Sequence, residues 1–188
     1  MRGISNISGK HVAAAVAVTL AVYAGAVRLT GNFHVVLPGE LYRSAQPTSA
    51  QIANYYEHYG IRTIINLRGE NPGAAWYDAE VAETRRLGIT LVDFHMSSRK
   101  GLTVAQAEKL VSILKDAQKP LLVHCEGGAD RTSLVAALYV AALTNLGEEA
   151  AEAELSVWYG HVSLPVTATY AVDRSWEALE PWLGFMDS

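Results

Sequence analysis

Residues 121–133 read "LLVHCEGGADRTS" and contain Cys125, the single cysteine of this 188-residue chain. The short apolar run at residues 121–124 is typical of a buried β-strand. A polar loop with two adjacent glycines follows it, and a helix is expected from Thr132 to about Leu146. A strand, a loop and a helix in this order form a unit of a parallel α/β sheet, in which ligands bind at the carboxyl ends of the strands.

Strand and helix patterns alternate through most of the chain around this unit. Two short strands surround the Pro38-Gly39 turn. The other expected elements are a helix near residues 49–59, a strand at 61–67, a helix at 76–88, a strand at 89–96, a helix that Thr103 can cap, and two C-terminal helices at 148–159 and about 168–183. Because parallel neighbours need crossover connections, this order predicts an α/β fold with a central, mostly parallel sheet of four to five strands flanked by helices. Trp158, Trp176 and Trp182 are expected to be packing residues of the C-terminal region.

The N-terminal region differs in kind from the rest. Residues 12–27, "VAAAVAVTLAVYAGAV", carry no charge over 16 positions and lie between Lys10 and Arg28. This pattern predicts an N-terminal hydrophobic helix in residues 1–30, which is either a signal peptide or a membrane anchor, because the run is short for a spanning helix. Under both interpretations the domain of residues 31–188 is expected outside the cytoplasm, anchored to the membrane by residues 12–27 or secreted after cleavage.

The charge balance limits the choice of partners. The chain carries a formal net charge of -4, and residues 1–30 contain three basic and no acidic residues, which leaves -7 for the remainder. Such a balance argues against a nucleic-acid partner. An anionic ligand must therefore be recognised by a focused local site rather than by a broad basic surface.

The loop after the strand at residues 121–124 has the residue types of such a site. Gly127 and Gly128 permit the dihedral angles with which successive backbone N–H groups point inward. The N-terminus of the following helix adds partial positive charge, and the guanidinium of Arg131 can hold two oxygens of a tetrahedral anion. The expected phosphate-binding residues are Glu126, Gly127, Gly128, Ala129, Asp130 and Arg131.

The positive charge of the helix N-terminus and of Arg131 also acts on the cysteine. Beside a helix N-terminus and an arginine, the thiolate form of Cys125 is favoured at neutral pH. Its attack on a bound phosphoryl group would form a phosphocysteine, which water then hydrolyses. In this scheme Thr132 donates a hydrogen bond to the sulfur and His124 steadies the loop.

These residues are similar to those of the cysteine-dependent protein tyrosine and dual-specificity phosphatases. The signature His-Cys-x5-Arg-Ser/Thr of that family is met by His124, Cys125, Arg131 and Thr132. The stretches "YRSAQP", "INLRGE" and "GADRT" resemble the atypical dual-specificity group found in bacteria, plants and fungi. The resemblance implies hydrolysis of a phosphorylated protein or a small phosphomonoester without a cofactor. We also expect no metal, because the histidines show no metal-ligand spacing.

The sequence offers two candidates for the proton donor of the leaving group. Members of the family usually carry an aspartate on a loop about thirty residues before the cysteine, but the corresponding residues 97–103, "SSRKGLT", contain no acid. Asp130, inside the phosphate loop, is the first candidate, as the resemblance to lipid phosphatases such as myotubularins implies. The alternative is that Asp130 braces the loop by pairing with Arg43 or Arg68. Asp93 is a further candidate, although the strand pattern around it favours a structural hydrogen bond.

Several functions remain open at this point. Glu126 and Ala129 in the loop disfavour a highly phosphorylated inositol, and a singly phosphorylated group such as phosphotyrosine fits better. A phospholipid or inositol phosphate phosphatase with the same mechanism is an alternative. So are a rhodanese-like sulfurtransferase, whose loop does not require the arginine, and an inactive phosphate-binding module, which usually lacks the cysteine or the arginine.

Overall fold

The computed structural model describes residues 30–185 without a gap and, before them, residues 11, 12, 14, 18, 22, 23 and 25. Most of the expected N-terminal hydrophobic helix therefore lies outside the described residues. Within the part of the chain that is described, none of the helices combines the length and the apolarity needed to cross a membrane.

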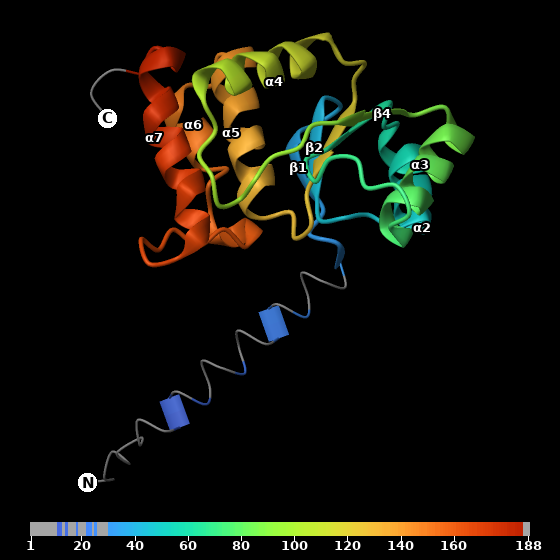
Figure 1. The fold of residues 1–188 in the computed structure, drawn as a ribbon, viewed down its shortest axis with the longest axis horizontal. Coiled ribbons are helices and arrows are strands. Elements are labelled where there is room, and N and C mark those ends of the chain that lie inside the picture. Colours follow the sequence, from blue (N-terminus) through green and yellow to red (C-terminus); the bar gives the residue numbers. More distant parts are fainter. Residues whose placement is uncertain are drawn as a thin grey trace, which may run out of the picture.

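The centre of the fold is a sheet whose strands follow the order β1-β2-β5-β3-β4 (Figure 1). The strands are β1 (His34–Leu37), β2 (Leu41–Ser44), β3 (Thr63–Asn66), β4 (Thr90–Asp93) and β5 (Leu121–His124). β1 pairs antiparallel with β2 at one edge, and all the other pairs are parallel. The predicted α/β class and the mostly parallel sheet of four to five strands are confirmed.

Helices cover both faces of the sheet (Figure 1). They are α2 (Ser49–Tyr59), α3 (Ala75–Leu87), α4 (Val104–Asp116), α5 (Asp130–Leu143), α6 (Glu148–Glu152) and α7 (Ala171–Leu183), with short 3-10 helices η1 (Val157–Tyr159) and η2 (Ala168–Tyr170). α2 and α3 lie on one face, and α4, α5, α6 and α7 lie on the other. The crossovers of the parallel sheet account for this division.

Alternate residues of the strands face the two helix layers, as the period of two of a strand requires. Leu41, Ile65 and Val123 belong to the larger apolar core, which α4, α5 and α7 share. Ile64 and Leu122 belong to the smaller core on the side of α2. α5 is the central helix of the larger core, since all its residues at 132–140 are buried.

The starts of the helices differ in one respect that concerns the site. Thr48 and Thr103 form complete capping boxes at the N-termini of α2 and α4, as expected for Thr103. α5 begins at Asp130, two residues before the predicted start at Thr132, and its N-cap residue Ala129 makes no side-chain capping bond. Because alanine has no side-chain acceptor, the first N–H groups of α5 have no such partner.

The C-terminal region was only partly predicted. α6 is shorter than the expected helix at residues 148–159, whereas α7 lies within the expected range. Trp176 is buried and Trp182 packs against the same core. The prediction for Trp158 is wrong, because its side chain is 72% exposed on η1.

The carboxyl ends of the parallel strands are aligned across the sheet. His124, the last residue of β5, pairs with Ser44 of β2 on one side and with Asn66 of β3 on the other. Asn66 in turn pairs with Asp93 at the end of β4. The segments that follow these strands therefore meet at one edge of the sheet, where a ligand site is expected.

Candidate active site

Cys125 follows β5 directly and lines a cavity of about 270 Å³ at this edge. The cavity is bounded by Ser98, Cys125, Glu126, Gly127, Ala129, Asp130 and Arg131. Most of the residues predicted for the phosphate loop thus surround one space together with the thiol. Ser98 was not predicted, because it comes from the segment after β4 and has no motif of its own.

The carbonyl groups of the loop are held from outside it. Hydrogen bonds to three consecutive carbonyls come from the Gln46 N–H to Glu126 O (3.2 Å), from Asn32 Nδ2 to Gly127 O (3.0 Å) and from Arg43 Nη2 to Gly128 O (3.3 Å). In a trans peptide the C=O of one residue and the N–H of the next point in opposite directions. The N–H groups of Gly127, Gly128 and Ala129 are therefore turned away from these donors, toward the concave side of the loop.

The N-terminus of α5 adds to this array of donors. The first helical bond runs from the Ser133 N–H to Ala129 O, at 2.8 Å. The N–H groups of the residues between them have no acceptor within the helix, and the helix dipole places partial positive charge at the same point. An anion bound in the cavity would meet both the loop amides and this helix end.

Residue 128 must be glycine for two reasons, neither of which applies to residue 127. The φ angle of Gly128 is +67°, and a Cβ there would lie 2.5 Å from the backbone N of Ala45 and 2.6 Å from the carbonyl carbon of Ser44. Gly127 is not among the glycines with positive φ, and apart from its two chain neighbours a Cβ there would meet no atom of the described residues within 4 Å. The expectation that both glycines supply special dihedral angles is wrong for Gly127.

Arg131 is held beside the thiol by two backbone carbonyls. Its Nη1 donates to Leu67 O and to Met96 O, each at 3.3 Å. These residues follow β3 and β4, so the aligned strand ends orient the guanidinium. Since only Nη1 is used in these two bonds, other N–H groups of Arg131 can bind an anion in the cavity that it lines.

Arg68 is a second cation at the site that sequence reasoning missed. Its guanidinium lies 3.5 Å from the centroid of the Trp76 ring and donates to Gln46 Oε1 at 2.9 Å. The pKa of Arg68 lies below its ordinary value, mainly because of burial. The charge of Arg131 also lowers this pKa, whereas Glu126 and Cys125 raise it. Arg68 therefore lies close enough to Cys125 and Arg131 to interact with them electrostatically. Arg68 lies in the stretch "INLRGE", which indicated only a resemblance to the family and not a cation at the site.

Arg43 is a third cation and lies entirely inside the protein. Its Nη1 is 2.6 Å from Glu154 Oε2, and its Nη2 donates to Ser133 Oγ at 2.5 Å. The guanidinium also lies 3.9 Å from the centroid of the Tyr159 ring. Burial lowers the pKa of Arg43, which the charge of Glu154 partly offsets. Arg43 supports the loop from behind and does not line the cavity.

His124 and Glu80 form a buried pair beneath the loop. His124 Nε2 lies 2.7 Å from Glu80 Oε1, and neither side chain is exposed. His124 Nδ1 donates to Cys125 O at 3.4 Å, since a carbonyl can only accept. Gln46 Nε2 donates to the other oxygen of Glu80 at 3.0 Å. Gln46 thus joins the loop, Glu80 and Arg68, a role that "YRSAQP" alone did not reveal.

The partner of Asp130 is a histidine rather than an arginine. His161 Nδ1 lies 2.8 Å from Asp130 Oδ1, and His161 Nε2 lies 3.0 Å from Asp173 Oδ1. Burial lowers the pKa of His161, but the hydrogen bonds to both carboxylates outweigh it and raise the pKa above its ordinary value. The expected pairing of Asp130 with Arg43 or Arg68 is wrong, because these arginines are engaged by Glu154 and Gln46.

Asp93 is bound on both oxygens. Asn66 Nδ2 donates to Oδ1 at 2.7 Å, and the Tyr77 hydroxyl donates to Oδ2 at 2.8 Å. Asp93 does not line the cavity of Cys125. The contacts therefore match the structural hydrogen-bonding role that its place in a strand favoured.

Thr132 lies in the first turn of α5 and is fully buried. Its hydroxyl makes no hydrogen bond within the described part of the chain. The predicted bond from Thr132 to the Cys125 sulfur is therefore not formed in this structure.

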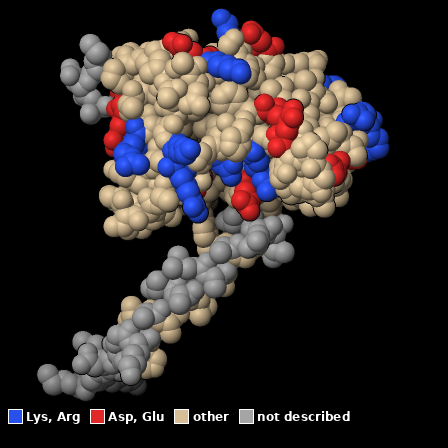
Figure 2. Space-filling view, viewed as in Figure 1, with Lys and Arg blue, Asp and Glu red and all other residues tan. Residues whose placement is uncertain are grey.

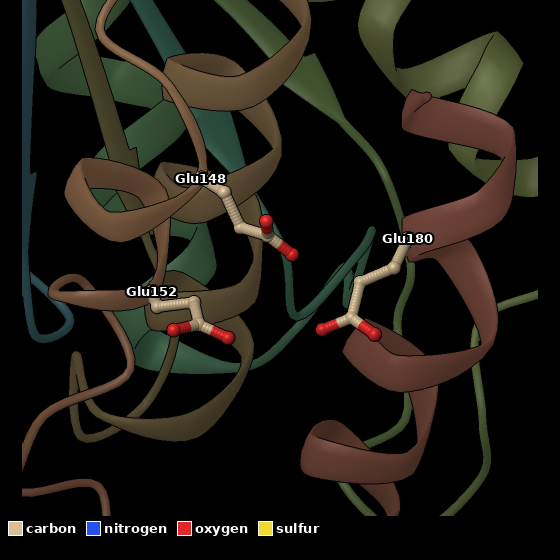
Figure 3. Close-up of side chains that lie close together, drawn as sticks. All are labelled: Glu148, Glu152 and Glu180. Carbon is tan, nitrogen blue, oxygen red and sulfur yellow. The ribbon is translucent and has the colours of Figure 1, made fainter. Parts of the chain in front are cut away.

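A group of acidic side chains lies away from this site. The carboxylates of Glu148 and Glu152 on α6 and of Glu180 on α7 point toward one another, with oxygens within 4.8 Å (Figure 3). Oxygen ligands of this kind suit hard cations such as Ca²⁺. None of the three lines the cavity of Cys125.

The face of the molecule seen in Figure 2 carries mixed charge. In the view of Figure 2, basic and acidic side chains are interspersed and no broad patch of one sign is visible. Arg131 and the start of α5 line the cavity, and Arg68 lies close enough to interact with Arg131. This agrees with the focused site that the acidic composition requires.

The fold and the site together define a cysteine-dependent phosphatase. The family described as "DSP-PTPase phosphatase fused to NAD+ Kinase" matches residues 32–162, and the chain belongs to this family. The resemblance that the signature around Cys125 indicated is thereby confirmed.

Solved structures of related phosphatases have the same fold. P. aeruginosa TpbA is 21% identical with a TM-score of 0.62, over 82% of this chain and 92% of TpbA. PTPMT1 is 16% identical with a TM-score of 0.61, over 81% of this chain and 98% of PTPMT1. The core catalytic domain of the PP-IP phosphatase SIW14 from S. cerevisiae is 20% identical with a TM-score of 0.59, over 83% of this chain and 94% of that domain.

Gly128→Ala should destabilise the protein, with Gly127→Ala as the matched control. The positive φ alone costs about 1–2 kcal/mol with a Cβ, and the contact with the backbone of Ala45 adds to it. Gly127→Ala should change the free energy of unfolding by less than about 1 kcal/mol, because neither cost arises there. Urea unfolding of both variants measures the difference. Equal losses would show that the loop does not need glycine at residue 128.

Proposed function

We propose that Cys125 is the nucleophile of a two-step hydrolysis of phosphomonoesters. The observation that carries the proposal is the set of outward hydrogen bonds on the loop carbonyls, which turns the loop N–H groups toward the cavity of Cys125. A phosphoryl group bound there carries negative charge that these donors and Arg131 stabilise, most strongly as charge grows in the transition state.

In the first step the Cys125 thiolate attacks phosphorus. The P–S bond forms, the bond from phosphorus to the ester oxygen breaks, and the departing oxygen takes a proton from Asp130. In the second step water attacks phosphorus, its proton returns to the Asp130 carboxylate, and the P–S bond breaks. Inorganic phosphate and the thiolate are the products, so neither step needs a cofactor.

A singly phosphorylated group such as phosphotyrosine is the proposed substrate class. Glu126 lines the cavity and would repel a second phosphate nearby, while Arg43 is already paired with Glu154. Among the structural relatives, one structure of TpbA contains pTyr and one of PTPMT1 contains PI(5)P. The second of these supports the alternative, a phospholipid or inositol phosphate substrate with the same mechanism.

The proposal for the N-terminal region is that residues 1–30 act as a signal peptide or a membrane anchor and that the catalytic domain works outside the cytoplasm. The uncharged run at residues 12–27 supports it. Within this run, the Tyr23 hydroxyl donates to Val157 O of η1 at 2.9 Å. Val157 and Trp158 there are 67% and 72% exposed, as suits a segment close to a membrane surface.

Cys125→Ser should abolish turnover of para-nitrophenyl phosphate, because the serine hydroxyl remains protonated and is a far weaker nucleophile. Vanadate should inhibit the unchanged protein, and a chelator should not. Acid quenching during turnover should trap a phosphoenzyme. Release of nitrophenol by the serine variant at an unchanged rate would exclude the mechanism. Cleavage of thiosulfate by the unchanged protein, without phosphatase activity, would point to a sulfurtransferase.

Asp130→Asn should slow phenyl phosphate, a poor leaving group, by about 100-fold or more, and para-nitrophenyl phosphate by less than about 10-fold. The nitrophenolate ion leaves without a proton, so loss of the acid matters less. Asp93→Asn is the matched control and should affect both substrates alike, through folding. If Asp130→Asn slows both substrates equally, Asp130 does not supply the proton.

Removal of residues 1–28 should shift the protein from the membrane or the exported fraction to the cytoplasm. Fusion of residues 1–30 to a reporter enzyme that is active only outside the cytoplasm should give activity. An inactive reporter would contradict both the anchor and the signal peptide. Cell fractionation then separates these two alternatives.

A further inference from the structure

A buried histidine connects the proposed acid to the C-terminal part of the chain. His161 is 1% exposed and lies in the segment between η1 and α7. Its backbone N–H donates to Ser156 O at 3.3 Å. The preceding residue is Gly160, where a Cβ would come within 3.5 Å of Ala129 Cβ. This segment therefore packs directly against the phosphate loop.

Both ring nitrogens of His161 face a carboxylate. Nδ1 lies 2.8 Å from Asp130 Oδ1 on α5, and Nε2 lies 3.0 Å from Asp173 Oδ1 on α7. A carboxyl oxygen without a proton can only accept, so a ring that carries both protons donates from Nδ1 to Asp130 Oδ1 and from Nε2 to Asp173 Oδ1. The proton that Asp130 gives to the leaving group is then carried on Oδ2. Charge-assisted hydrogen bonds of this kind are stronger than neutral ones, particularly with the ring shielded from water.

The pair of bonds constrains Asp130. The Asp130 side chain is 25% exposed and lines the cavity of Cys125. Its Oδ1 is bound to the His161 ring, whose other nitrogen is bound to Asp173 of α7. With Oδ1 fixed, the carboxylate has one orientation, and Oδ2 is the oxygen left to exchange a proton with a leaving group. Proton transfer requires this oxygen within hydrogen-bond reach of the ester oxygen.

We propose that His161, clamped by Asp173, is a positioning residue that orients Asp130 for proton transfer to the leaving group. The inference rests on the proposed function of Asp130 as the acid. His161 does not line the cavity and acts only through Asp130. A purely structural role is the competing explanation, since the same contacts also join α5 to α7.

His161→Phe tests the proposal, because it keeps a ring but removes both hydrogen bonds. The rate with phenyl phosphate should fall about 10- to 100-fold, and that with para-nitrophenyl phosphate by only a few fold, because only the first substrate needs a well-placed proton. In a protein that already carries Asp130→Asn, the same change should alter neither rate by more than about two-fold.

His161→Asn is the second variant and covers a failure of the phenylalanine variant to fold. Its side-chain amide can occupy the place of Nδ1 and donate to Asp130, so it should lose less activity toward phenyl phosphate than His161→Phe does. Thermal unfolding of each variant records the structural effect separately.

The outcomes separate this inference from the proposed function. If Asp130→Asn changes the preference between the two substrates and His161→Phe slows both substrates alike, the positioning role is overturned and the acid stands. An undiminished effect of His161→Phe in the Asp130→Asn protein would also overturn it. If Asp130→Asn leaves the preference unchanged, the acid itself fails, and the inference with it.

Discussion

The site depends on the hydrogen bonds that hold the loop carbonyls from outside. A loop that turns its N–H groups toward one point must turn its carbonyls the other way, into the protein, where each unsatisfied group costs about 1–3 kcal/mol. Asn32, Arg43 and Gln46 satisfy them from segments far away in the sequence. Arg43 can be buried for this purpose because Glu154 compensates its charge. The hydrogen bonds that shape the anion site therefore come from residues outside the loop.

This arrangement explains how an acidic domain binds an anion. Residues 31–188 carry a net charge of -7, and their surface has no broad basic patch in the view of Figure 2. The amides of the loop and the start of α5 contribute oriented dipoles without net charge. Arg131 adds its charge at the cavity and Arg68 lies close enough to interact with Arg131, while Glu126 on the cavity wall offsets part of this positive charge. Recognition of an anion by such a site depends on geometry at short range rather than on the net charge of the domain.

Short sequence patterns predicted those features of the fold that depend on neighbouring residues of the chain. The bounds of α2 and the cap at Thr103 followed from capping and periodicity, and the loop followed from the spacing of Cys125 and Arg131. The bond between Asp130 and His161 joins residues 31 positions apart, and no spacing rule connects them. The same holds for the support of the loop, because donors such as Asn32 are found only once the strand ends are aligned.

The catalytic unit extends beyond the residues that the family match covers. The match ends at residue 162, yet α7 supplies Asp173 to His161 and places Trp176 in the larger core. The usual separate acid loop has no carboxylate here, because residues 97–103 contain none. An acid in the first turn of α5 moves with the phosphate loop and needs no loop closure to reach the substrate. Under the proposed role of Asp130 as the acid, its orientation comes from His161 and Asp173, and the C-terminal segment then contributes to the active site.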